Sequence, residues 1–219
     1  MKVLLKGIYI LVTLVNWDIR IIGITDKRYM EGSFFERIER AIDGGVGVIE
    51  IREKELSSAD FYDKAKRLLR ICRERGAKLI VNDRVDVALA IGADGVHLGK
   101  EDLPIEAVKS IFGGVIGWTA RNPGDALRGE RAGADYIGAG SVFASRTKEA
   151  KLIGLDGLKR IKEAVSIPVI AVGGITKENI RMVMETGVDG IAVSSALFLG
   201  DPYENASELL KAMEGYVNN

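Results

Sequence analysis

The segment VNDRVDVALAIGADGVHLGKED, residues 81–102, contains one full repeat of a strand–helix–strand pattern. It begins at the end of an apolar, β-branched run over 78–82 and reaches a second such run over 94–98. The connection ends in Ile-Gly-Ala-Asp, where the glycine is suited to end a helix and the aspartate leads into the next strand. Polar residues follow both runs directly. The segment therefore predicts two strands that carry functional groups at their carboxyl ends.

The same junction occurs three times, as IGADGV from 91, AGADYI from 132 and TGVDGI from 186. Short β-branched runs alternate with amphipathic helical stretches from residue 21 onward, without a change of composition. Eight such units predict an α/β protein with a single-domain (β/α)8 TIM barrel. A doubly wound open sheet is the alternative, because alternation does not by itself show closure. The expected strands are 21–25, 46–51, 78–82, 94–98, 114–118, 135–140, 168–173 and 189–194.

Composition limits the classes of function. The chain has 31 Lys and Arg and 31 Asp and Glu, so its formal charge is zero. A broad surface for nucleic acid or for an anionic membrane needs an excess of cations, so neither partner is expected. The single cysteine, Cys72, excludes an internal disulfide and fits a reducing cytoplasm. The single histidine, His97, cannot form a multi-histidine metal site. The oligomeric state, including a homo-oligomer, stays open.

Residues 1–20, MKVLLKGIYILVTLVNWDIR, are unusually apolar and precede the first expected strand. They are too few to span a bilayer, because Asp18 and Arg20 close the apolar run. They also lack the small-residue cleavage site of a signal peptide. An added strand and an incorrectly assigned start codon are both open readings. We therefore divide the chain into an N-terminal extension of unclear role over 1–20 and a catalytic barrel over 21–219.

Polar residues are distributed unevenly between the two rims of the expected barrel. In such barrels the chemistry lies in the loops that follow the strands. The loops of the opposite rim carry mainly Gly-Ala-Asp caps. The first rim is therefore the predicted active-site face. The polar and glycine residues of this rim follow the second to eighth strands in this order: Arg52, Glu53 and Lys54; Asn82 and Asp83; Lys100, Glu101 and Asp102; Thr119; Ser145, Arg146, Thr147 and Lys148; Gly173 and Gly174; Ser194 and Ser195.

The second expected strand carries two charged residues on one face. Side chains alternate along a strand, so Glu50 and Arg52 share one face while Ile49 and Ile51 share the other. If the isoleucines contact the helices, Glu50 and Arg52 point into the barrel. A buried charge needs a partner. These two residues are therefore expected to pair with each other or with a ligand.

Asp83 and Asp102 follow two successive expected strands, the third and the fourth. Two converging carboxylates without a histidine suit Mg²⁺, which takes oxygen ligands and keeps waters for phosphate partners. An aspartate after a strand also commonly caps a helix. The positions of Lys54 and Lys148 favour the metal site, and capping is the alternative.

Two parts of the active-site rim suit anions. The loop GSVFASRTKEA, 140–150, offers hydroxyls and cations as hydrogen-bond donors, although a solvated surface loop would have the same composition. The segments AVGGI, 171–175, and VSS, 193–195, occupy the usual phosphate site of such barrels, where glycines let backbone N–H groups approach a phosphate. The rim thus has two expected anion sites, one lined by Lys54, Lys148 and the expected metal and the other by the last two loops. Two anion sites around one barrel mouth predict a bisphosphate substrate or two phosphorylated substrates.

In sequence order, these motifs resemble the thiamine-phosphate synthase family, also called thiamine-phosphate pyrophosphorylase, from about Ile21 to Met213. The matching segments are GITDKRYMEG; IEIREK, against the family's Q-x-R-x-K; VNDRVDVALAIGADGVHLGKED; GAGSVFASRTK, against G-x-G-P-[VI]-[FY]-x-T-x-T-K; VIAVGGIT; and GVDGIAVSSAL. The resemblance implies that hydroxymethylpyrimidine diphosphate condenses with a thiazole phosphate, giving thiamine phosphate and pyrophosphate. It also implies a dissociative mechanism through a pyrimidine cation.

The resemblance further implies roles for individual residues. Asp83 and Asp102 would hold Mg²⁺ on the diphosphate. Arg52, Lys54 and Lys148 would neutralise the departing charge, and Thr119 would lie near the reacting groups; these four form the expected catalytic set. The implied contacts of the pyrimidine diphosphate are Glu50, Ile51, Arg52, Glu53, Lys54, Asn82, Thr119 and Lys148. The implied contacts of the thiazole phosphate are Ser145, Thr147, Gly174, Ser194 and Ser195.

The chain departs from the family pattern at several positions. Glu50 stands where the family has glutamine, and Arg121 stands where a histidine is frequent. Thr119 replaces serine, Ser145 replaces threonine and Ala144 replaces proline. A carboxylate can only accept hydrogen bonds, whereas an amide also donates them. Glu50 therefore puts the substrate contacts in question more than the reaction type.

Three alternatives to a synthase are compatible with a barrel of this kind. A related thiazole tautomerase is expected to lack the Asn-Asp pair and to use a histidine after the fifth strand; here Asn82 and Asp83 are present and that loop reads WTARNP. A Schiff-base aldolase needs a desolvated lysine inside the barrel, but Lys54 and Lys148 belong to the rim. A non-catalytic binder of thiamine precursors is the third alternative.

Overall fold

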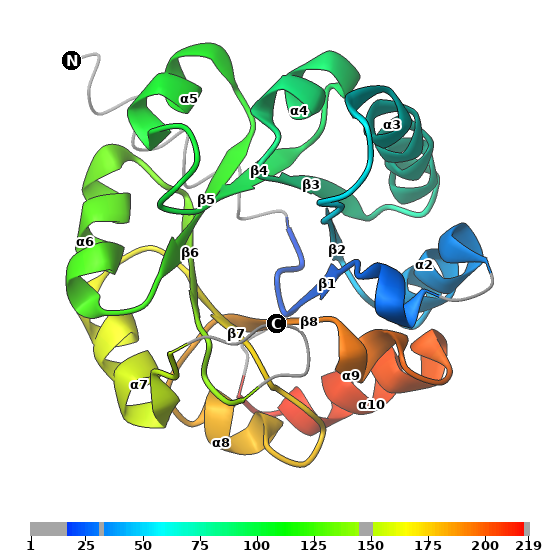
Figure 1. Ribbon diagram of the computed structural model, residues 1–219. Helices are drawn as coiled ribbons and strands as arrows, with labels where there is room; N and C mark the ends of the chain where they lie inside the picture. Colours follow the sequence, from blue (N-terminus) through cyan, green and yellow to red (C-terminus); the bar gives the residue numbers. More distant parts are fainter. Residues whose placement is uncertain (1–16, 31–32, 145–150, 217–219) are drawn as a thin grey trace.

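The computed structural model describes residues 17–30, 33–144 and 151–216 of the chain. Its eight strands form a closed barrel in which sequence neighbours pair in parallel and β8 pairs with β1, Ile21 opposite Ile191 (Figure 1). This pairing confirms the predicted (β/α)8 barrel and excludes the open doubly wound sheet. The strands are β1 (Ile21–Ile24), β2 (Val48–Ile51), β3 (Lys78–Asn82), β4 (Gly95–Leu98), β5 (Val115–Ala120), β6 (Tyr136–Gly140), β7 (Val169–Val172) and β8 (Gly190–Val193).

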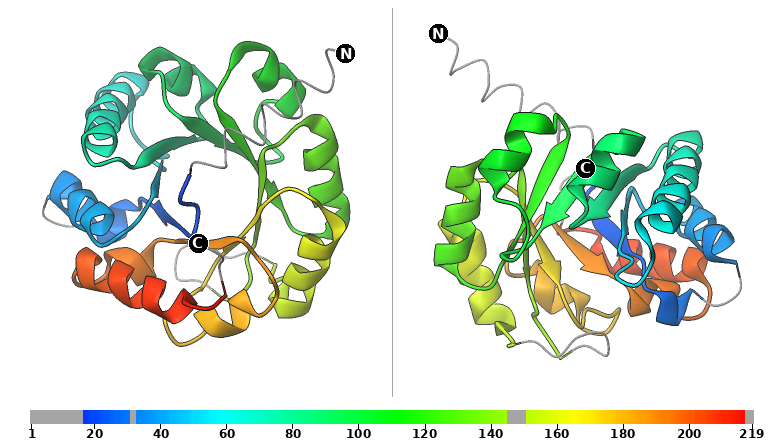
Figure 2. Two further views of the ribbon diagram at one scale, coloured as in Figure 1. Left: turned by 180° about the vertical axis from the view of Figure 1, so that it is seen from behind. Right: turned by 45° about the horizontal axis from the view of Figure 1, so that its top comes forward.

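Helices follow the strands and form a ring around the barrel, as Figures 1 and 2 show from its two ends. The helix α2 begins after Ser33, whose hydroxyl accepts a hydrogen bond from the Glu36 N–H, and α3 begins in the same way after Ser57. The helical elements are η1 (Lys27–Tyr29), α2 (Phe34–Asp43), α3 (Ser58–Glu74), α4 (Val85–Ile91), α5 (Ile105–Ile111), α6 (Pro123–Ala132), α7 (Gly154–Ala164), α8 (Ile180–Met184), α9 (Ser195–Phe198) and α10 (Pro202–Met213).

The three repeated Gly-Ala-Asp-like junctions share one hydrogen-bond pattern. The carboxylate of Asp135, just before β6, accepts a hydrogen bond from the Ile116 N–H of β5 at 2.8 Å. Asp94 accepts an equivalent bond at 3.0 Å from the N–H of Leu79, the second residue of β3, and Asp189 accepts one at 2.7 Å from the N–H of Val169, the first residue of β7. Each junction therefore joins the beginning of one strand to its preceding neighbour through a side chain. The repeat in the sequence has a structural cause at the rim opposite the predicted active site.

Two apolar layers hold the barrel together. The outer layer lies between strands and helices and includes Ile49 and Ile51. The inner layer fills the barrel and includes Val48, Ile80 and Tyr136. The predicted alternation along β2 is therefore confirmed, because its isoleucines face the helices. Burial of these side chains supplies the main driving force for folding.

The end of the N-terminal extension closes the barrel at the amino ends of the strands. Trp17 and Ile19 pack against the inner layer. The chain passes so close to β8 that a Cβ on Gly190 would lie 2.1 Å from the Ile19 carbonyl oxygen. Residues 17–20 therefore cover the inner apolar layer at the amino ends of the strands. Residues 1–16 lie outside the described part of the chain.

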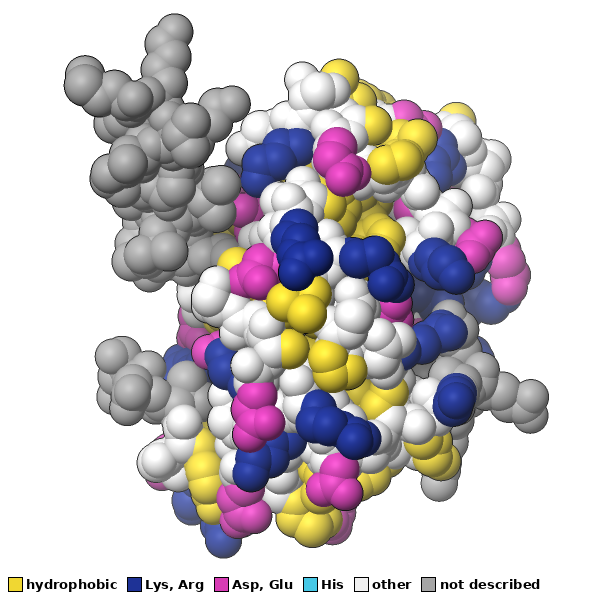
Figure 3. All heavy atoms as spheres, turned by 90° about the vertical axis from the view of Figure 1, so that its left-hand side faces the viewer, with side chains coloured by type: hydrophobic (Ala, Val, Ile, Leu, Met, Phe, Trp, Pro, Cys, Tyr) yellow, Lys and Arg dark blue, Asp and Glu magenta, His cyan; other side chains and the backbone are white. Residues whose placement is uncertain are grey.

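The surface and the single cysteine agree with the composition. Lys and Arg side chains are interspersed with Asp and Glu on the face that includes α6 (Figure 3). Cys72 is buried in α3, and burial raises the pKa of its thiol to about 12, so the thiol is unreactive at neutral pH. Among the helices of the described residues, none combines the length and the apolar character that crossing a bilayer requires.

Candidate active site

A cavity of about 1710 Å³ opens at the carboxyl ends of the strands. All eight strands contribute lining residues, from Ile22 in β1 to Val193 in β8. This is the rim at which enzymes of this fold carry their chemistry. The cavity brings together ten of the residues that the sequence predicts for the site: Glu50, Arg52, Lys54, Asn82, Asp83, Asp102, Thr119, Gly174, Ser194 and Ser195.

Of the other five predicted site residues, two are described and do not line the cavity, and three are not described. Ile51 is fully buried in the outer apolar layer, so only its main chain can contact a ligand in the barrel. The Glu53 side chain is 7% exposed and forms an ion pair with Lys64 of α3. Ser145, Thr147 and Lys148 lie outside the described residues.

Thr119 lies within a strand and not after one, in contrast to the prediction. The sequence places the end of the fifth strand at residue 118, but β5 continues through Ala120. The physical reason is pairing with β6, because Thr119 lies opposite Gly138 and Ala120 opposite Ala139. Thr119 consequently has a position defined by the barrel wall and contributes its hydroxyl to the cavity.

The Asp83 and Asp102 side chains meet at the mouth of the cavity. Burial raises the pKa of the Asp102 carboxyl, and the neighbouring Asp83 carboxylate raises it further; the Gly99 N–H and Lys54 act in the opposite direction. Asp102 accepts a hydrogen bond from the Gly99 N–H at 2.7 Å. Two carboxyl groups this close cannot both ionise easily without a compensating cation.

Neither aspartate caps a helix through its side chain. The N-cap residues of α4 and α5 are Arg84 and Pro104, and neither helix has a side-chain cap bond. Asp83 has a φ of 63°, in the left-handed region that residues with a side chain rarely adopt. Such a conformation stores strain and is commonly found at functional sites. These observations weaken the capping alternative.

The donor set around this pair fits a Mg²⁺ ion that also binds phosphate oxygens of a ligand. Within the described ranges no group of three or more His, Cys, Asp or Glu side chains could hold a metal ion. Mg²⁺ is commonly bound by one or two carboxylates, with phosphate oxygens and waters completing its octahedron. Asp83 and Asp102 match this pattern, with hard oxygen ligands that repel each other in the absence of a cation.

Glu50 is 4% exposed and lines the cavity from β2. No hydrogen bond or salt bridge joins its carboxyl to any described residue, so of the two predicted alternatives, an ion pair with Arg52 or pairing with a ligand, the ion pair is not formed. Burial raises the pKa of Glu50 to about 8; the Asp83 carboxylate adds to this effect and Arg52 opposes it. The carboxyl group therefore carries its proton at neutral pH.

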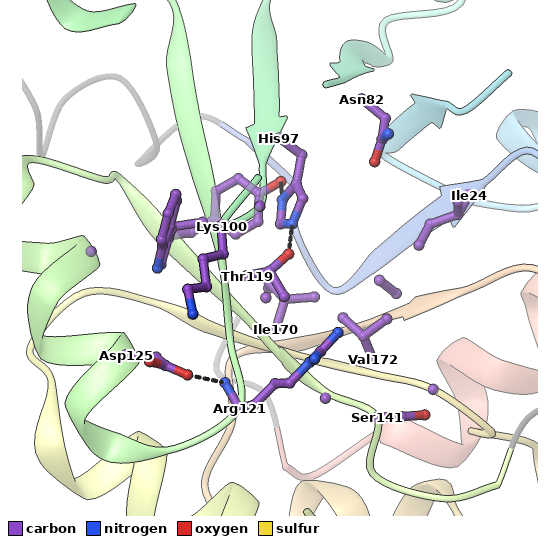
Figure 4. A pocket seen from close by; sticks show the side chains of 18 of the residues that line it. Ile24, Asn82, His97, Lys100, Thr119, Arg121, Asp125, Ser141, Ile170 and Val172 are labelled. Carbon is purple, nitrogen blue, oxygen red and sulfur yellow. Dashed lines mark hydrogen bonds between the residues drawn. The ribbon is translucent and has the colours of Figure 1, made fainter. Parts of the chain in front are cut away.

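A hydrogen-bonded chain that the sequence did not predict crosses the inside of the barrel and joins His97, Thr119 and Tyr136. The His97 Nε2 lies 2.9 Å from the Thr119 Oγ1, and its Nδ1 lies 2.8 Å from the Tyr136 hydroxyl (Figure 4). Burial lowers the pKa of His97 to about 4, so the imidazole is neutral at pH 7. Strand alternation in DGVHL, with Val96 and Leu98 facing outward, could have identified His97 as an inward residue.

Arg121 is a further cation of the cavity. Its side chain extends from the end of β5 into the cavity toward Val172 of β7 (Figure 4). Its backbone N–H donates to the Asp125 carboxylate at 3.4 Å, but no described residue makes a hydrogen bond or ion pair with the guanidinium. The guanidinium is thus available to an anionic ligand.

The loops that follow β7 and β8 offer hydrogen-bond donors to a ligand. Gly173 and Gly174 have φ values of 101° and 66°, which glycine adopts without a steric penalty. The Asn179 side chain donates to the Gly174 carbonyl at 2.9 Å and so holds the loop in place. The Ser194 hydroxyl is buried and has no hydrogen-bond partner in the described structure. Buried hydroxyls are normally paired, so Ser194 is available to bind an oxygen atom of a ligand.

Comparisons with known proteins agree with this arrangement. Residues 21–197 match the family described as thiamine monophosphate synthase. The thiamine-phosphate synthase of Caldanaerobacter subterraneus subsp. tengcongensis is 44% identical over 199 residues, which cover 89% of this chain and 93% of the relative. That of Clostridium novyi is 47% identical over 192 residues, which cover 85% and 94%.

A solved structure agrees as well. The thiamine phosphate pyrophosphorylase from Pyrococcus furiosus has a TM-score of 0.86 and 43% sequence identity to this chain. The similarity covers 93% of this chain and 100% of that protein. With its barrel, its paired carboxylates and these relatives, the chain belongs to the thiamine monophosphate synthase family.

Proposed function

We propose that the protein is a thiamine-phosphate synthase, a transferase of thiamine biosynthesis. It would condense hydroxymethylpyrimidine diphosphate with a thiazole phosphate, form thiamine phosphate and release pyrophosphate. The observation that carries this proposal is the meeting of Asp83 and Asp102 in one cavity with unpaired donors at Ser194 and Arg121. Two anionic ligands can therefore be bound around one barrel mouth.

The diphosphate end of the first substrate would bind at the carboxylate pair. Asp83 and Asp102 would hold Mg²⁺, which lowers the charge of the diphosphate and makes it a better leaving group. Arg52 and Lys54, both lining the cavity, would stabilise the charge that grows on the departing pyrophosphate. Lys148 is assigned to the same task on the family resemblance alone.

The pyrimidine would lie deeper in the barrel, against Glu50, Asn82 and Thr119. Ile51 and Glu53 would contribute through their main chain, since their side chains pack elsewhere. The bond between the pyrimidine methylene carbon and the diphosphate oxygen would break first, and its electron pair would leave with the pyrophosphate. The exocyclic amino group would delocalise the resulting positive charge.

The interior of the barrel is suited to a cationic intermediate. His97 is neutral and hydrogen-bonded at both ring nitrogens, so it adds no positive charge beside the cation. The apolar inner layer reaches the same cavity through Ile22 and Ile170 and would exclude water. Exclusion of water protects a reactive carbocation from hydrolysis.

The thiazole phosphate would bind on the opposite side of the mouth. Gly174, Ser194 and Ser195 would hold its phosphate, and Ser145 and Thr147 are assigned to it on the family resemblance. The thiazole nitrogen would then donate its lone pair to the pyrimidine methylene carbon, forming the new carbon–nitrogen bond. Holding both substrates in this geometry lowers the entropic barrier of the second step.

The compartment is part of the same proposal. We assign the protein to the cytoplasm, because its one cysteine is a buried packing residue and its substrates are small phosphorylated molecules. The interspersed surface charges give no support to a nucleic-acid partner.

The test is direct. The purified chain is given both substrates with Mg²⁺, and released pyrophosphate and thiamine phosphate are measured in the same sample. A synthase forms the two products in equal amounts, and omission of either substrate prevents the condensation. Binding of both substrates without products would identify a non-catalytic binder. Isomerisation of the thiazole without pyrophosphate release would identify a tautomerase, which Arg121 in place of a histidine disfavours.

A further inference from the structure

Glu50 is a buried carboxyl group that has no partner in the described protein. It lies in the middle of the barrel wall, with its Cα opposite that of Ile80 in β3. An ionised carboxylate in such a place costs several kcal/mol unless another group compensates its charge. An unpaired buried group that lines a ligand cavity is therefore expected to interact with the ligand.

The charged groups that act on Glu50 come from three sides. Asp83 follows β3 and opposes its ionisation, whereas Arg52, two residues further along β2, favours it. Tyr136 of β6 interacts electrostatically with Glu50 and bonds to His97 of β4, which is neutral. Burial is the largest effect and, with Asp83, keeps the proton on Glu50 up to a pH of about 8. The group can therefore donate a hydrogen bond at neutral pH.

We propose that Glu50 binds the pyrimidine of the first substrate as a neutral carboxylic acid, donating its O–H to a ring nitrogen while its carbonyl oxygen accepts from the exocyclic amino group. This inference rests on the proposed function, because it assumes that an aminopyrimidine enters the barrel. It adds a protonation state and a hydrogen-bond pattern to the pyrimidine contact that the proposed function assigns to Glu50.

The chemistry of the ring requires one donor and one acceptor from the protein. An aminopyrimidine presents an amino donor beside a ring-nitrogen acceptor. A neutral carboxylic acid complements both atoms, as a primary amide does. An ionised carboxylate can only accept hydrogen bonds, so its lone pairs would repel the lone pair of the ring nitrogen. Because His97, Thr119 and Tyr136 already pair with one another, they are less available for this task.

The experiment measures protons directly and needs neither Mg²⁺ nor a diphosphate. The probe is 4-amino-5-hydroxymethyl-2-methylpyrimidine, titrated into the full-length protein by calorimetry at pH 9 in two buffers of different ionisation enthalpy. At this pH most of the free protein carries an ionised Glu50, so binding must take up nearly one proton per ligand. Between pH 8.5 and 10 the Kd rises by about tenfold per pH unit, because only the protonated form binds.

Glu50→Gln is the matched control, since the amide retains a donor and an acceptor but does not titrate in this range. It is expected to bind the probe with no proton uptake and with a Kd that does not change with pH. Glu50→Ala, checked for folding by circular dichroism, is expected to lose at least about tenfold in affinity. No proton uptake by the unchanged protein, or an equal pH dependence in Glu50→Gln, would overturn the proposal. So would loss of binding in a folded Glu50→Gln variant, because it would show that a carboxylate is required.

The proposed function and the role of Glu50 can be refuted independently of each other. If the unchanged protein takes up a proton with the probe but releases no pyrophosphate from the two substrates, the synthase assignment is wrong and the role of Glu50 stands. If pyrophosphate is released at a normal rate but the probe binds without proton uptake, only the role of Glu50 is overturned. Absence of any binding of the probe would count against both.

Discussion

The Lys54 ammonium lies 3.6 Å from the Asp83 carboxylate, yet the Lys54 side chain is 58% exposed. An ion pair open to water contributes little to stability. One exposed cation also leaves the second carboxylate, Asp102, without full compensation, which agrees with the direction of its pKa. The two carboxylates, Asp83 and Asp102, are therefore suited to a cation of higher charge than a lysine. The first two predictions concern these carboxylates.

Asp102→Asn should weaken the dependence on Mg²⁺ while leaving the fold intact. The amide oxygen can still accept the Gly99 N–H, so the loop geometry is kept. Loss of one negative ligand should raise the Mg²⁺ concentration for half-maximal turnover by at least about tenfold. Pyrophosphate release over a series of Mg²⁺ concentrations measures this, with thermal unfolding as the control. An unchanged Mg²⁺ requirement would contradict the metal site.

Asp83→Gly should stabilise the metal-free protein and abolish turnover. Glycine adopts a φ of 63° without strain, and its introduction removes the repulsion with Asp102. We expect a gain of about 1 kcal/mol in the free energy of unfolding, measured in urea without Mg²⁺. Asp83→Ala is the matched control, since it removes the charge but retains a Cβ in the left-handed region. If both variants unfold at the same urea concentration, backbone strain at this position is absent.

Lys148→Ala should lower turnover by about 100-fold or more, since it removes a charge assigned to the leaving pyrophosphate. Lys148 lies outside the described residues, so thermal unfolding of the variant serves as the control for its fold. Steady-state kinetics with both substrates saturating measure the effect. A nearly normal kcat would remove Lys148 from the catalytic set.

Glu50→Gln should change how stability depends on pH. The pKa of Glu50 is about 8 in the folded protein and 4.5 in the reference state, so the folded state binds more protons between these values. Stability from this group is therefore fully present below pH 4.5 and decreases as the pH rises to about 8. The Glu50→Gln variant lacks this titration. Its free energy of unfolding should therefore rise relative to that of the unchanged protein between pH 4.5 and about 8, and the difference should be constant above that range. Thermal unfolding at pH 5, 7 and 9 provides the comparison, and a constant difference would contradict the raised pKa.

Asp135→Ala should destabilise the barrel without altering the chemistry. The change leaves the buried Ile116 N–H without its acceptor, which costs about 1–3 kcal/mol in the free energy of unfolding. Asp135→Asn retains an acceptor oxygen and should lose less. Urea unfolding measures stability, while KM for both substrates should stay unchanged because Asp135 lies at the opposite rim. An equal loss in both variants would show that the charge, and not the hydrogen bond, matters.

Much of the site was predictable from strand periodicity. The period of two places Glu50 toward the inside and Ile51 toward the helices, and the structure confirms both. The same rule applied to DGVHL would have placed His97 inside the barrel. It could not show that His97 pairs with Thr119 and Tyr136, because these residues lie on three different strands. The extension of β5 to Ala120 was missed for the same reason, since it depends on pairing with β6.

The sequence by itself determined the alternation of strands and helices, the inward and outward faces of each strand, and the concentration of polar residues at one rim. These features depend on residues close together in the chain, whose spacing dictates local geometry. Only the tertiary structure decided that β8 pairs with β1, that Asp83 meets Asp102, and that Glu50 is left without a partner. These relationships join distant parts of the chain. The register and closure of the barrel set the distances between them, and no local pattern contains that information.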